Sequence, residues 1–331
     1  MRKWLEIYWG KLQSAYQNPK SRRLLFLGIM LISLVFIAIA LSTNWSEFDA
    51  QEINFDYRYI IFAVFIYPAG MLPTAISWHT ILRTIGVALP FRTNLRIFSL
   101  SALPKHIPGF VWYISSRSLL YKEEGISAKV IVTASAADII LLALTGFLSA
   151  LMLLVSGIGI SQEISTIRTA AFIAIPILCL LIISIPLVNR LLPYFLERRG
   201  VYEIPTIHQG KLVATLLVMF IAWAGGGLIL FVLSQAIYPL SWSMYPAMIG
   251  AWGAAGAVSL TIGIGIQGLG IREITLSAIL SLIMPPVIAV ILTIIFRLVL
   301  TAGEFLWVML FIWLTKNPQP IIRVQYPKII A

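Results

Sequence analysis

Residues 287–314 read VIAVILTIIFRLVLTAGEFLWVMLFIWL, an apolar run with only Arg297 and Glu304 inside it. At about 1.5 Å per residue, a helix of this length crosses the roughly 30 Å hydrocarbon core of a bilayer. Similar apolar runs, with charges concentrated at or beyond their ends, occupy residues 24–41, 59–82, 130–155, 168–189 and 212–234. The sequence therefore predicts six full membrane spans.

The composition agrees with a polytopic membrane protein. Hydrophobic residues make up 60% of the 331-residue chain and charged residues 11%, against roughly 25% charged in a soluble domain. This excludes a soluble globular protein, and continuous rather than alternating apolar runs exclude a β-barrel. The single cysteine, Cys179, lies in an apolar run, so a disulfide framework and a cysteine metal cluster are excluded too.

The charges predict which loops face the cytoplasm. The chain has 24 Lys and Arg against 13 Asp and Glu, and the basic residues cluster between the apolar runs, so we interpret them as topology signals and expect no nucleic-acid partner. Residues 42–58 are acidic. The positive-inside rule then places both termini in the cytoplasm and 42–58 outside, in a multi-pass protein of the cell membrane. We expect a basic cytoplasmic segment at 1–23, one transmembrane domain at 24–315 and a cytoplasmic tail at 316–331.

Two further apolar stretches, 93–122 and 244–284, are interrupted by helix-breaking sequences. The first contains LPKHIPG at residues 103–109, and the second contains GIGIQGLG at residues 263–270. Each stretch must return to the side it left if the charge rule is to hold, which favours two re-entrant helical hairpins lining an interior site. The alternative is a plain bundle of eight spans with Gly/Pro kinks.

The order of spans and hairpins also predicts an inverted repeat. Residues 59–155 form a span, a hairpin entered from the cytoplasm and a span, and residues 212–314 repeat this order upside down. The loop glycines Gly109 and Gly268 are 159 residues apart, as are the in-span charges Asp138 and Arg297. Inverted repeats with paired broken helices are typical of secondary transporters, whose binding site lies between the repeats near the bilayer midplane.

Polar residues near the two breaks are the candidate site. In the second half, the loop glycines Gly268 and Gly270 precede Arg272 and Glu273, so loop amides, a helix start and a guanidinium converge, as in phosphate or carboxylate sites. In the first half, cations and aromatic residues surround the break and suit an anionic lipid headgroup, although an anchor at the cytoplasmic edge explains them as well: Lys105, His106, Trp112, Arg117.

Three acids accompany these cations. Arg297 and Glu304 lie on one face of their span near its midpoint, and Asp138 is the acid of the span 130–155. Arg297 joins the predicted headgroup-binding residues, and Asp138, Glu273 and Glu304 are predicted to balance the cations. The set is either a polar path through the bilayer or a buried ion-pair network that fixes helix packing. His79 is interpreted as a satisfied polar residue. No catalytic motif is found, so we expect neither an enzyme nor a cofactor or metal site.

Two stretches of the sequence, each next to a predicted break, resemble the sequence of a known membrane-protein family. Residues 105–112 (KHIPGFVW), Arg117 and Asp138 resemble the first hairpin of the membrane domain of lysylphosphatidylglycerol synthases and their stand-alone flippase-like relatives. Residues 268–273 (GLGIRE), with Arg297 and Glu304, are similar to that family's second half. The aminoacyltransferase domain of the lysyl-lipid enzymes is not found in this sequence. The resemblance therefore implies that the chain translocates a lipid or a lipid-linked sugar.

The function expected from the sequence is movement of an anionic phospholipid or a polyprenyl-phosphate-linked sugar between leaflets. Two alternatives stay open: an ion-coupled transporter of a small polar solute, and a non-transporting scaffold subunit for a membrane-associated transferase. The sequence does not decide among them, and it gives no oligomeric state.

Overall fold

The computed structural model describes residues 55–102, 110–156, 209–262 and 271–314, and the regular elements in these ranges are all helical. They are α4 (Tyr57–Thr84), α5 (Phe91–Ala102), α6 (Phe110–Glu123), α7 (Ala128–Ala150), α8 (Met152–Val155), α10 (Gln209–Ser234), the 3₁₀ turn η2 (Trp242–Met244), α11 (Tyr245–Ile262), α12 (Ile271–Leu280) and α13 (Pro286–Leu314). The predicted all-helical class is confirmed for this part of the chain.

Within the described ranges, four helices are long and apolar enough to cross a membrane: Tyr57–Thr84, Ala128–Ala150, Gly210–Ser234 and Pro286–Phe311. They match the predicted spans at 59–82, 130–155, 212–234 and 287–314, although a turn at Leu151 separates α7 from the short α8. The predicted spans 24–41 and 168–189, the N-terminal segment and the tail lie outside the described residues. Four of the six predicted spans therefore correspond to helices that could cross a membrane, and the count of six stays a prediction.

Local sequence sets several helix ends. The side chain of Asp56 accepts a hydrogen bond from the backbone N–H of Arg58 at 3.0 Å and caps α4. Ser127 caps α7 by accepting from Val130 N–H. Gly125, just beyond the end of α6, has φ +79°, a conformation that glycine adopts without steric cost.

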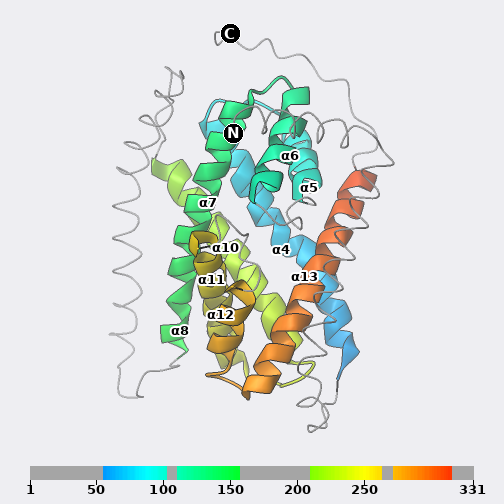
Figure 1. The fold of residues 1–331 in the computed structure, drawn as a ribbon, viewed down its shortest axis with the longest axis vertical. Coiled ribbons are helices and arrows are strands. Elements are labelled where there is room, and N and C mark those ends of the chain that lie inside the picture. Colours follow the sequence, from blue (N-terminus) through cyan, green and yellow to red (C-terminus); the bar gives the residue numbers. More distant parts are fainter. Residues whose placement is uncertain (1–54, 103–109, 157–208, 263–270, 315–331) are drawn as a thin grey trace, which may run out of the picture.

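Helices occur on both sides of each predicted break. α5 and α6 flank residues 103–109 and contact each other, and α11 and α12 do the same around residues 263–270. The breaks themselves lie outside the described residues. Figure 1 shows α5 and α6 near the top of the view and α11 and α12 in its lower half. α4 and α13 run upward in this view, whereas α7 and α10 run downward.

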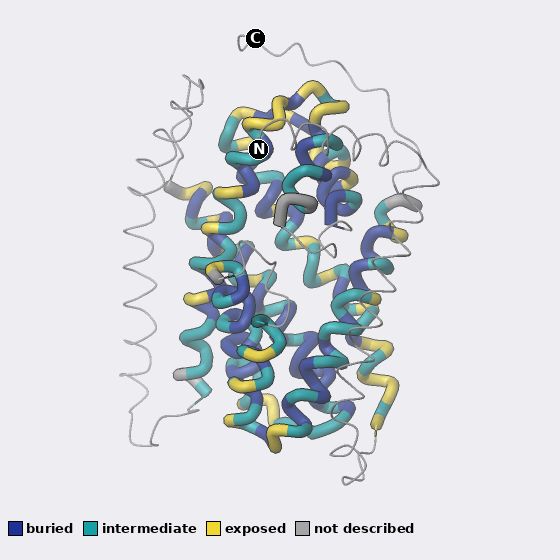
Figure 2. Tube along the Cα trace, viewed as in Figure 1, coloured by how far each residue is buried: buried dark blue, intermediate teal, exposed yellow. Residues whose placement is uncertain are grey.

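Small residues allow the helices to pack closely. α4 meets α10 where a Cβ on Gly225 would lie 3.3 Å from the Cα of Gly70. α7 meets α11 through Gly253, where a Cβ would lie 2.5 Å from that of Ser149. Such contacts are typical of membrane helices, whose association depends on close van der Waals packing rather than on burial from water. Figure 2 shows buried residues concentrated on the faces that the helices turn toward one another.

Candidate functional site

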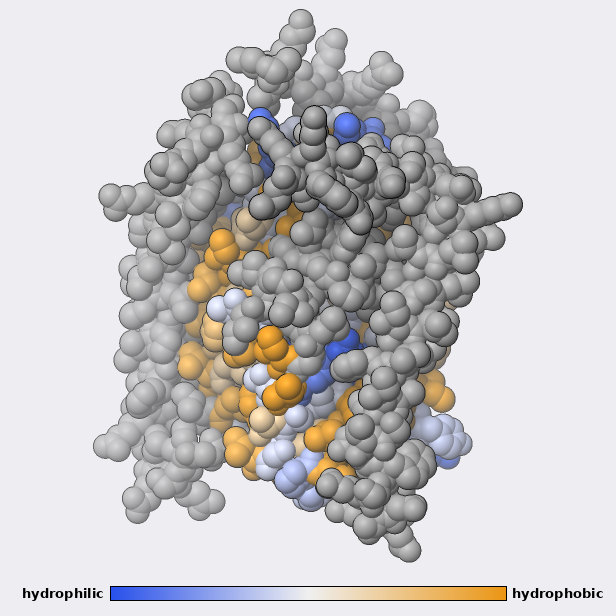
Figure 3. Space-filling model, viewed as in Figure 1, coloured by the Kyte–Doolittle hydropathy of each residue, from blue (hydrophilic) through white to orange (hydrophobic). Residues whose placement is uncertain are grey.

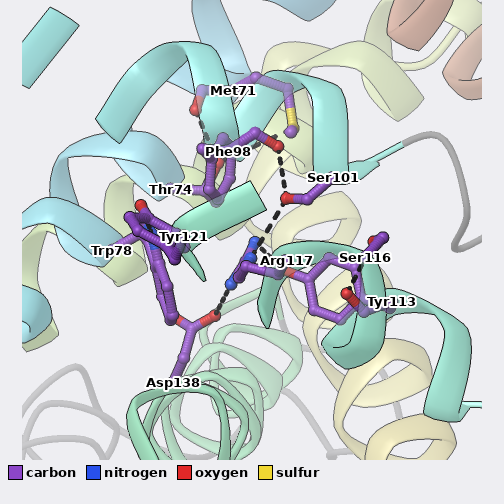
Figure 4. A network of polar contacts seen from close by, with 10 residues as sticks. All are labelled: Met71, Thr74, Trp78, Phe98, Ser101, Tyr113, Ser116, Arg117, Tyr121 and Asp138. Carbon is purple, nitrogen blue, oxygen red and sulfur yellow. Dashed lines mark hydrogen bonds and ion pairs between the residues drawn. The ribbon is translucent and has the colours of Figure 1, made fainter. Parts of the chain in front are cut away.

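One face of α6 carries three large polar side chains. Tyr113, Arg117 and Tyr121 are spaced four residues apart, so they stack along the same side of the helix. This side faces α4, α5 and α7, whose side chains surround Arg117 (Figure 4). The four-residue spacing therefore places the three side chains on the same face of α6.

Arg117 is fully buried and has several partners. Its Nη1 lies 3.7 Å from Oδ2 of Asp138 on α7, and its Nε donates a hydrogen bond to Ser101 Oγ at 3.2 Å. Nη2 donates to the hydroxyl of Tyr113. The guanidinium carbon also lies 3.9 Å from the centroid of the Trp78 ring, a cation–π contact. Charge, hydrogen bonds and aromatic faces together hold this buried cation.

A chain of hydrogen bonds begins at Trp78 on α4, passes through α6 and α5, and returns to α4 at His79. Trp78 Nε1 donates to Tyr121 Oη at 2.8 Å, and Tyr121 Oη donates to Asn94 Oδ1 at 3.0 Å. Asn94 Nδ2 lies 2.6 Å from His79 Nδ1. The interpretation of His79 as a satisfied polar residue is thus confirmed, and the chain joins α4, α5 and α6.

A second charged group lies where α12 meets α13. Glu273 on α12 forms an ion pair with Arg297 on α13, and these two side chains are 23% and 25% exposed. Arg272, beside Glu273, is half-buried, with its guanidinium carbon 5.1 Å from the ring centroid of Trp252. Its Nε is buried and has no hydrogen-bond partner among the described residues. This leaves one donor of Arg272 available for an acceptor.

Glu304 connects the two charged groups. Its residue exposure is 2%, and it interacts electrostatically with Arg272 on α12, Tyr67 on α4 and Tyr113 on α6. Glu304 lies four residues after the middle of α13, and Arg297 lies three residues before that middle. Two tyrosines from the first half of the chain and Arg272 from the second half therefore lie near Glu304, at about half the depth of this span.

Each of the two ion pairs joins the helix after a predicted break to the following span, with the cation and the acid in opposite order. In the first half the cation, Arg117, is on the helix after the break and the acid, Asp138, is on the following span. In the second half the acid, Glu273, is on the helix after the break and the cation, Arg297, is on the following span. The sequence placed Arg297 on the same helix face as Glu304, and the structure shows its ion pair with Glu273 on α12.

The structure describes only some of the predicted headgroup-binding residues. It places Arg272, Arg297 and the acids Glu273 and Glu304 around the junction of α12 and α13, and it places Arg117 in the network of Figure 4 with Asp138. Lys105, His106, Gly268, Gly270 and the side chain of Trp112 lie outside the described part of the structure. Binding by any of these residues stays a prediction.

Several site residues were not found from the sequence. Trp78, Asn94 and Ser101 contribute to the Arg117 network from α4 and α5. Asn94 and Ser101 are polar residues on the buried, mostly apolar face of α5, and a polar residue at such a position is the signal that could have identified them. Tyr67 and Trp252 look like ordinary aromatic residues of apolar helices, and only their position beside Glu304 and Arg272 sets them apart.

Comparison with known proteins identifies the family. The model of the family described as the lysylphosphatidylglycerol synthase TM region matches residues 25–307. The chain belongs to this family. The match covers both charged groups and confirms the resemblance seen in the sequence. A comparison with curated proteins finds no match.

Membership in the lysylphosphatidylglycerol synthase TM-region family supports two statements about the chain. The protein is embedded in a membrane, as the four apolar helices also indicate. Its function is related to membrane lipids. The described charged residues lie within the helices that the family match covers, so they are the natural candidates for that function.

Proposed function

We propose that this protein translocates a phosphate-bearing lipid, an anionic phospholipid or a polyprenyl-phosphate-linked sugar, between the leaflets of the cell membrane. The observation that carries the proposal is the convergence of Arg272, Arg297, Glu273 and Glu304 near half the depth of α13. Ionisable groups at this depth are costly in a bilayer, and they usually mark the path of a polar substrate. A lipid headgroup crossing the membrane is such a substrate.

The chemistry of the cluster suits a phosphate. A guanidinium offers several N–H donors in one plane and binds phosphate oxygens in pairs, and Arg272 has a buried Nε without a partner among the described residues. The partial exposure of Arg297 and Glu273 supports access to the cluster. Figure 3 shows hydrophilic atoms among hydrophobic ones midway down the molecule, in the region of α12 and α13.

The proposal includes two re-entrant hairpins, α5–α6 and α11–α12, that enter from opposite sides. The directions of the long helices support this, because α4 ends and α7 begins at the upper end of Figure 1, whereas α10 ends and α13 begins at the lower end. Each hairpin thus connects helix ends on one side of the molecule. Breaks at membrane depth must be lined by protein or water, which favours a binding site next to them.

The proposal also includes an inverted repeat in which α4, α5, α6 and α7 correspond to α10, α11, α12 and α13. The helix contacts support this correspondence: α4–α7 is matched by α10–α13, α4–α13 by α10–α7, and α5–α13 by α11–α7. α4 and α10 correspond to each other and contact each other, as helices beside a two-fold axis do.

The sequence at the contact between α4 and α10 supports the same axis. Residues 65–70 read FIYPAG and residues 220–225 read FIAWAG, and their last residues, Gly70 and Gly225, are the two glycines in contact. A two-fold axis brings equivalent residues together, so this contact is the one expected for an inverted repeat. Secondary transporters use this architecture to expose one central site to each side in turn.

We further propose that the chain moves its substrate without chemically modifying it, and that both termini are cytoplasmic. The experiment that tests translocation uses the full chain in proteoliposomes containing acyl-chain-labelled phosphatidylglycerol, with a membrane-impermeant quencher added outside. A parallel sample contains a fluorophore-labelled polyprenyl phosphate. The fraction of label that becomes accessible over time reports exchange between leaflets.

Arg272→Gln is expected to slow the exchange by about tenfold or more, because it removes charge-assisted hydrogen bonds worth about 1.5–3 kcal/mol. Arg92→Gln, a change at an exposed arginine on α5, is the matched control and keeps the wild-type rate. If wild-type protein exchanges neither lipid faster than empty liposomes, the proposal fails. A scaffold subunit would give that result.

A further inference from the structure

The chain of hydrogen bonds from Trp78 to His79 has a fixed direction. An indole N–H can only donate, so Trp78 Nε1 donates to Tyr121 Oη, and the single hydrogen of that hydroxyl is donated to Asn94 Oδ1. The other polar atom of the Asn94 amide, Nδ2, is a donor and lies 2.6 Å from His79 Nδ1. Nδ1 must therefore accept, which places the one ring hydrogen of neutral His79 on Nε2.

A second proton on the His79 ring does not fit this chain. It would bind Nδ1, because Nε2 already carries a hydrogen, and two donors would then face each other across 2.6 Å. Turning over the Asn94 amide presents Oδ1 to His79, but it also presents Nδ2 to Tyr121, whose own hydrogen then loses its acceptor. Tyr121 is 0% exposed and Asn94 is 1% exposed, so water does not replace the lost hydrogen bond. With His79 protonated, the chain is one hydrogen bond short in either arrangement.

The chain connects the two helices beside the first predicted break to α4. Asn94 lies on α5, Tyr121 lies on α6, and Trp78 and His79 lie on α4. The rings of Tyr121 and Trp78 also pack together, with centroids 6.1 Å apart, and the Trp78 ring contacts the buried Arg117 guanidinium (Figure 4). Loss of a hydrogen bond from the chain therefore weakens the attachment of α5 and α6 to α4 beside Arg117.

His79 lies where a proton can reach it. Its side chain is half-buried, stands five residues before the end of α4, and packs edge-on against Phe91 with ring centroids 5.3 Å apart. Arg83, one turn further along α4, is the charged residue described as interacting with it. The elements packed against this helix or joined to it by Tyr121 carry the following other titratable and charged side chains: Arg92 and Arg96 on α5, Tyr113, Arg117, Tyr121, Lys122 and Glu123 on α6, Glu124 after it, Lys129 and Asp138 on α7, Lys211 and Tyr238 on and after α10, and Arg297 and Glu304 on α13.

We propose that His79 is a pH switch, in which protonation breaks the hydrogen-bonded chain and loosens α5 and α6 from α4. The ordinary charge change of histidine falls between about pH 5 and 8. The contacts of the structure belong to neutral His79, so α5 and α6 are held at the higher pH and loosened as the pH falls through this range. The proposal goes beyond lipid translocation and does not depend on which substrate the protein moves.

Hydrogen–deuterium exchange of the full chain in detergent tests the proposal. Wild-type protein is compared with His79→Gln at about pH 7.5 and again at about pH 5. Glutamine has a carbonyl oxygen that can accept from Asn94, and it takes up no proton. Comparing two proteins at one pH removes the effect of pH on the intrinsic exchange rate. At the lower pH, the amides of α5 and α6 are expected to exchange about five- to tenfold faster in wild-type protein, the ratio for loss of one hydrogen bond, and at the higher pH they are expected to exchange equally.

A second histidine supplies the matched control. His208→Gln is expected to keep the wild-type response to pH, and the amides of α12 serve as an internal reference. Equal exchange of α5 and α6 in wild-type and His79→Gln protein at the lower pH overturns the proposal. A wild-type increase that is as large in α12 as in α5 and α6 also overturns it.

Wild-type protein decides the matter if His79→Gln does not fold or already alters exchange at the higher pH. The indole N–H of Trp78 is at the far end of the chain from His79. Its nitrogen-15 signal, assigned by its absence in Trp78→Phe, is expected to shift between about pH 7.5 and 5, whereas the signal of the exposed Trp242 keeps its position. A Trp78 signal that does not shift over this range overturns the proposal.

Discussion

Arg117 and Asp138 form an ion pair between α6 and α7 in which the guanidinium is fully buried and the carboxylate is 14% exposed. The pair lies under the aromatic rings of Trp78 and Tyr113, both within 4.3 Å of the guanidinium carbon. α6, the helix after the first break, is therefore held to α7 by an ion pair whose cation is buried. The predictions below begin from this pair.

Asp138→Ala is expected to destabilise the protein by about 3–5 kcal/mol, because it leaves the buried Arg117 without its anion. The double variant Arg117→Met with Asp138→Ala is expected to be more stable than Asp138→Ala alone, since neither charge is then buried. Thermal unfolding in detergent measures both. Equal losses in the single and double variants would contradict a stabilising pair.

Trp78→Phe is expected to lower stability by about 1–3 kcal/mol, because phenylalanine lacks the N–H that donates to Tyr121 and binds the Arg117 cation more weakly. Trp242→Phe is the matched control, since Trp242 is 71% exposed. The two melting temperatures should separate clearly. Similar values would show that the Trp78 hydrogen bond contributes little.

Gly227→Ala is expected to disrupt packing between α10 and α11, because a Cβ there would lie 2.7 Å from the backbone Cα of Ile249. The expected loss is about 1–3 kcal/mol. Gly210→Ala, at the beginning of the same helix, meets nothing within 4 Å and is expected to be neutral or slightly stabilising. Resistance to thermal unfolding in detergent compares them, and a stable Gly227→Ala protein would refute the close contact.

Arg297→Gln separates stability from transport. Alone, it is expected to lower thermal stability, since it leaves Glu273 without its ion-pair partner from α13. Adding Glu273→Gln is expected to restore stability without restoring lipid exchange, because the guanidinium is still absent. Both quantities are measured on the same preparations. Full exchange by a stable Arg297→Gln protein would remove Arg297 from the mechanism.

Cysteine labelling tests the predicted sidedness in a Cys179→Ser background. Ser243→Cys lies in the exposed turn before α11 and is expected to react with an impermeant thiol reagent in intact cells. Glu123→Cys, exposed at the end of α6, is expected to react only after the cells are permeabilised. The reverse pattern would invert the topology.

The spans and the helices around the two breaks were predictable because their causes are local. A continuous apolar run of this length specifies a membrane helix wherever its neighbours lie, and α4, α7, α10 and α13 begin and end within a few residues of the predictions. The segments 103–109 and 263–270 were expected to break helices for an equally local reason, since they contain Pro and Gly, and the described helices α5, α6, α11 and α12 flank them.

The sequence by itself thus determined that the chain is a helical membrane protein and that Arg117, Asp138, Arg272, Glu273, Arg297 and Glu304 lie inside its apolar segments. Only the tertiary structure decided which of these charges meet. Spacing along one helix relates residues three or four positions apart, but Arg297 pairs with Glu273 on another helix, and Trp78 bonds to Tyr121 across 43 residues. Partners on separate helices are set by how those helices pack, and packing depends on contacts along the whole interface, such as Gly70 on Gly225 and Gly303 on Tyr67.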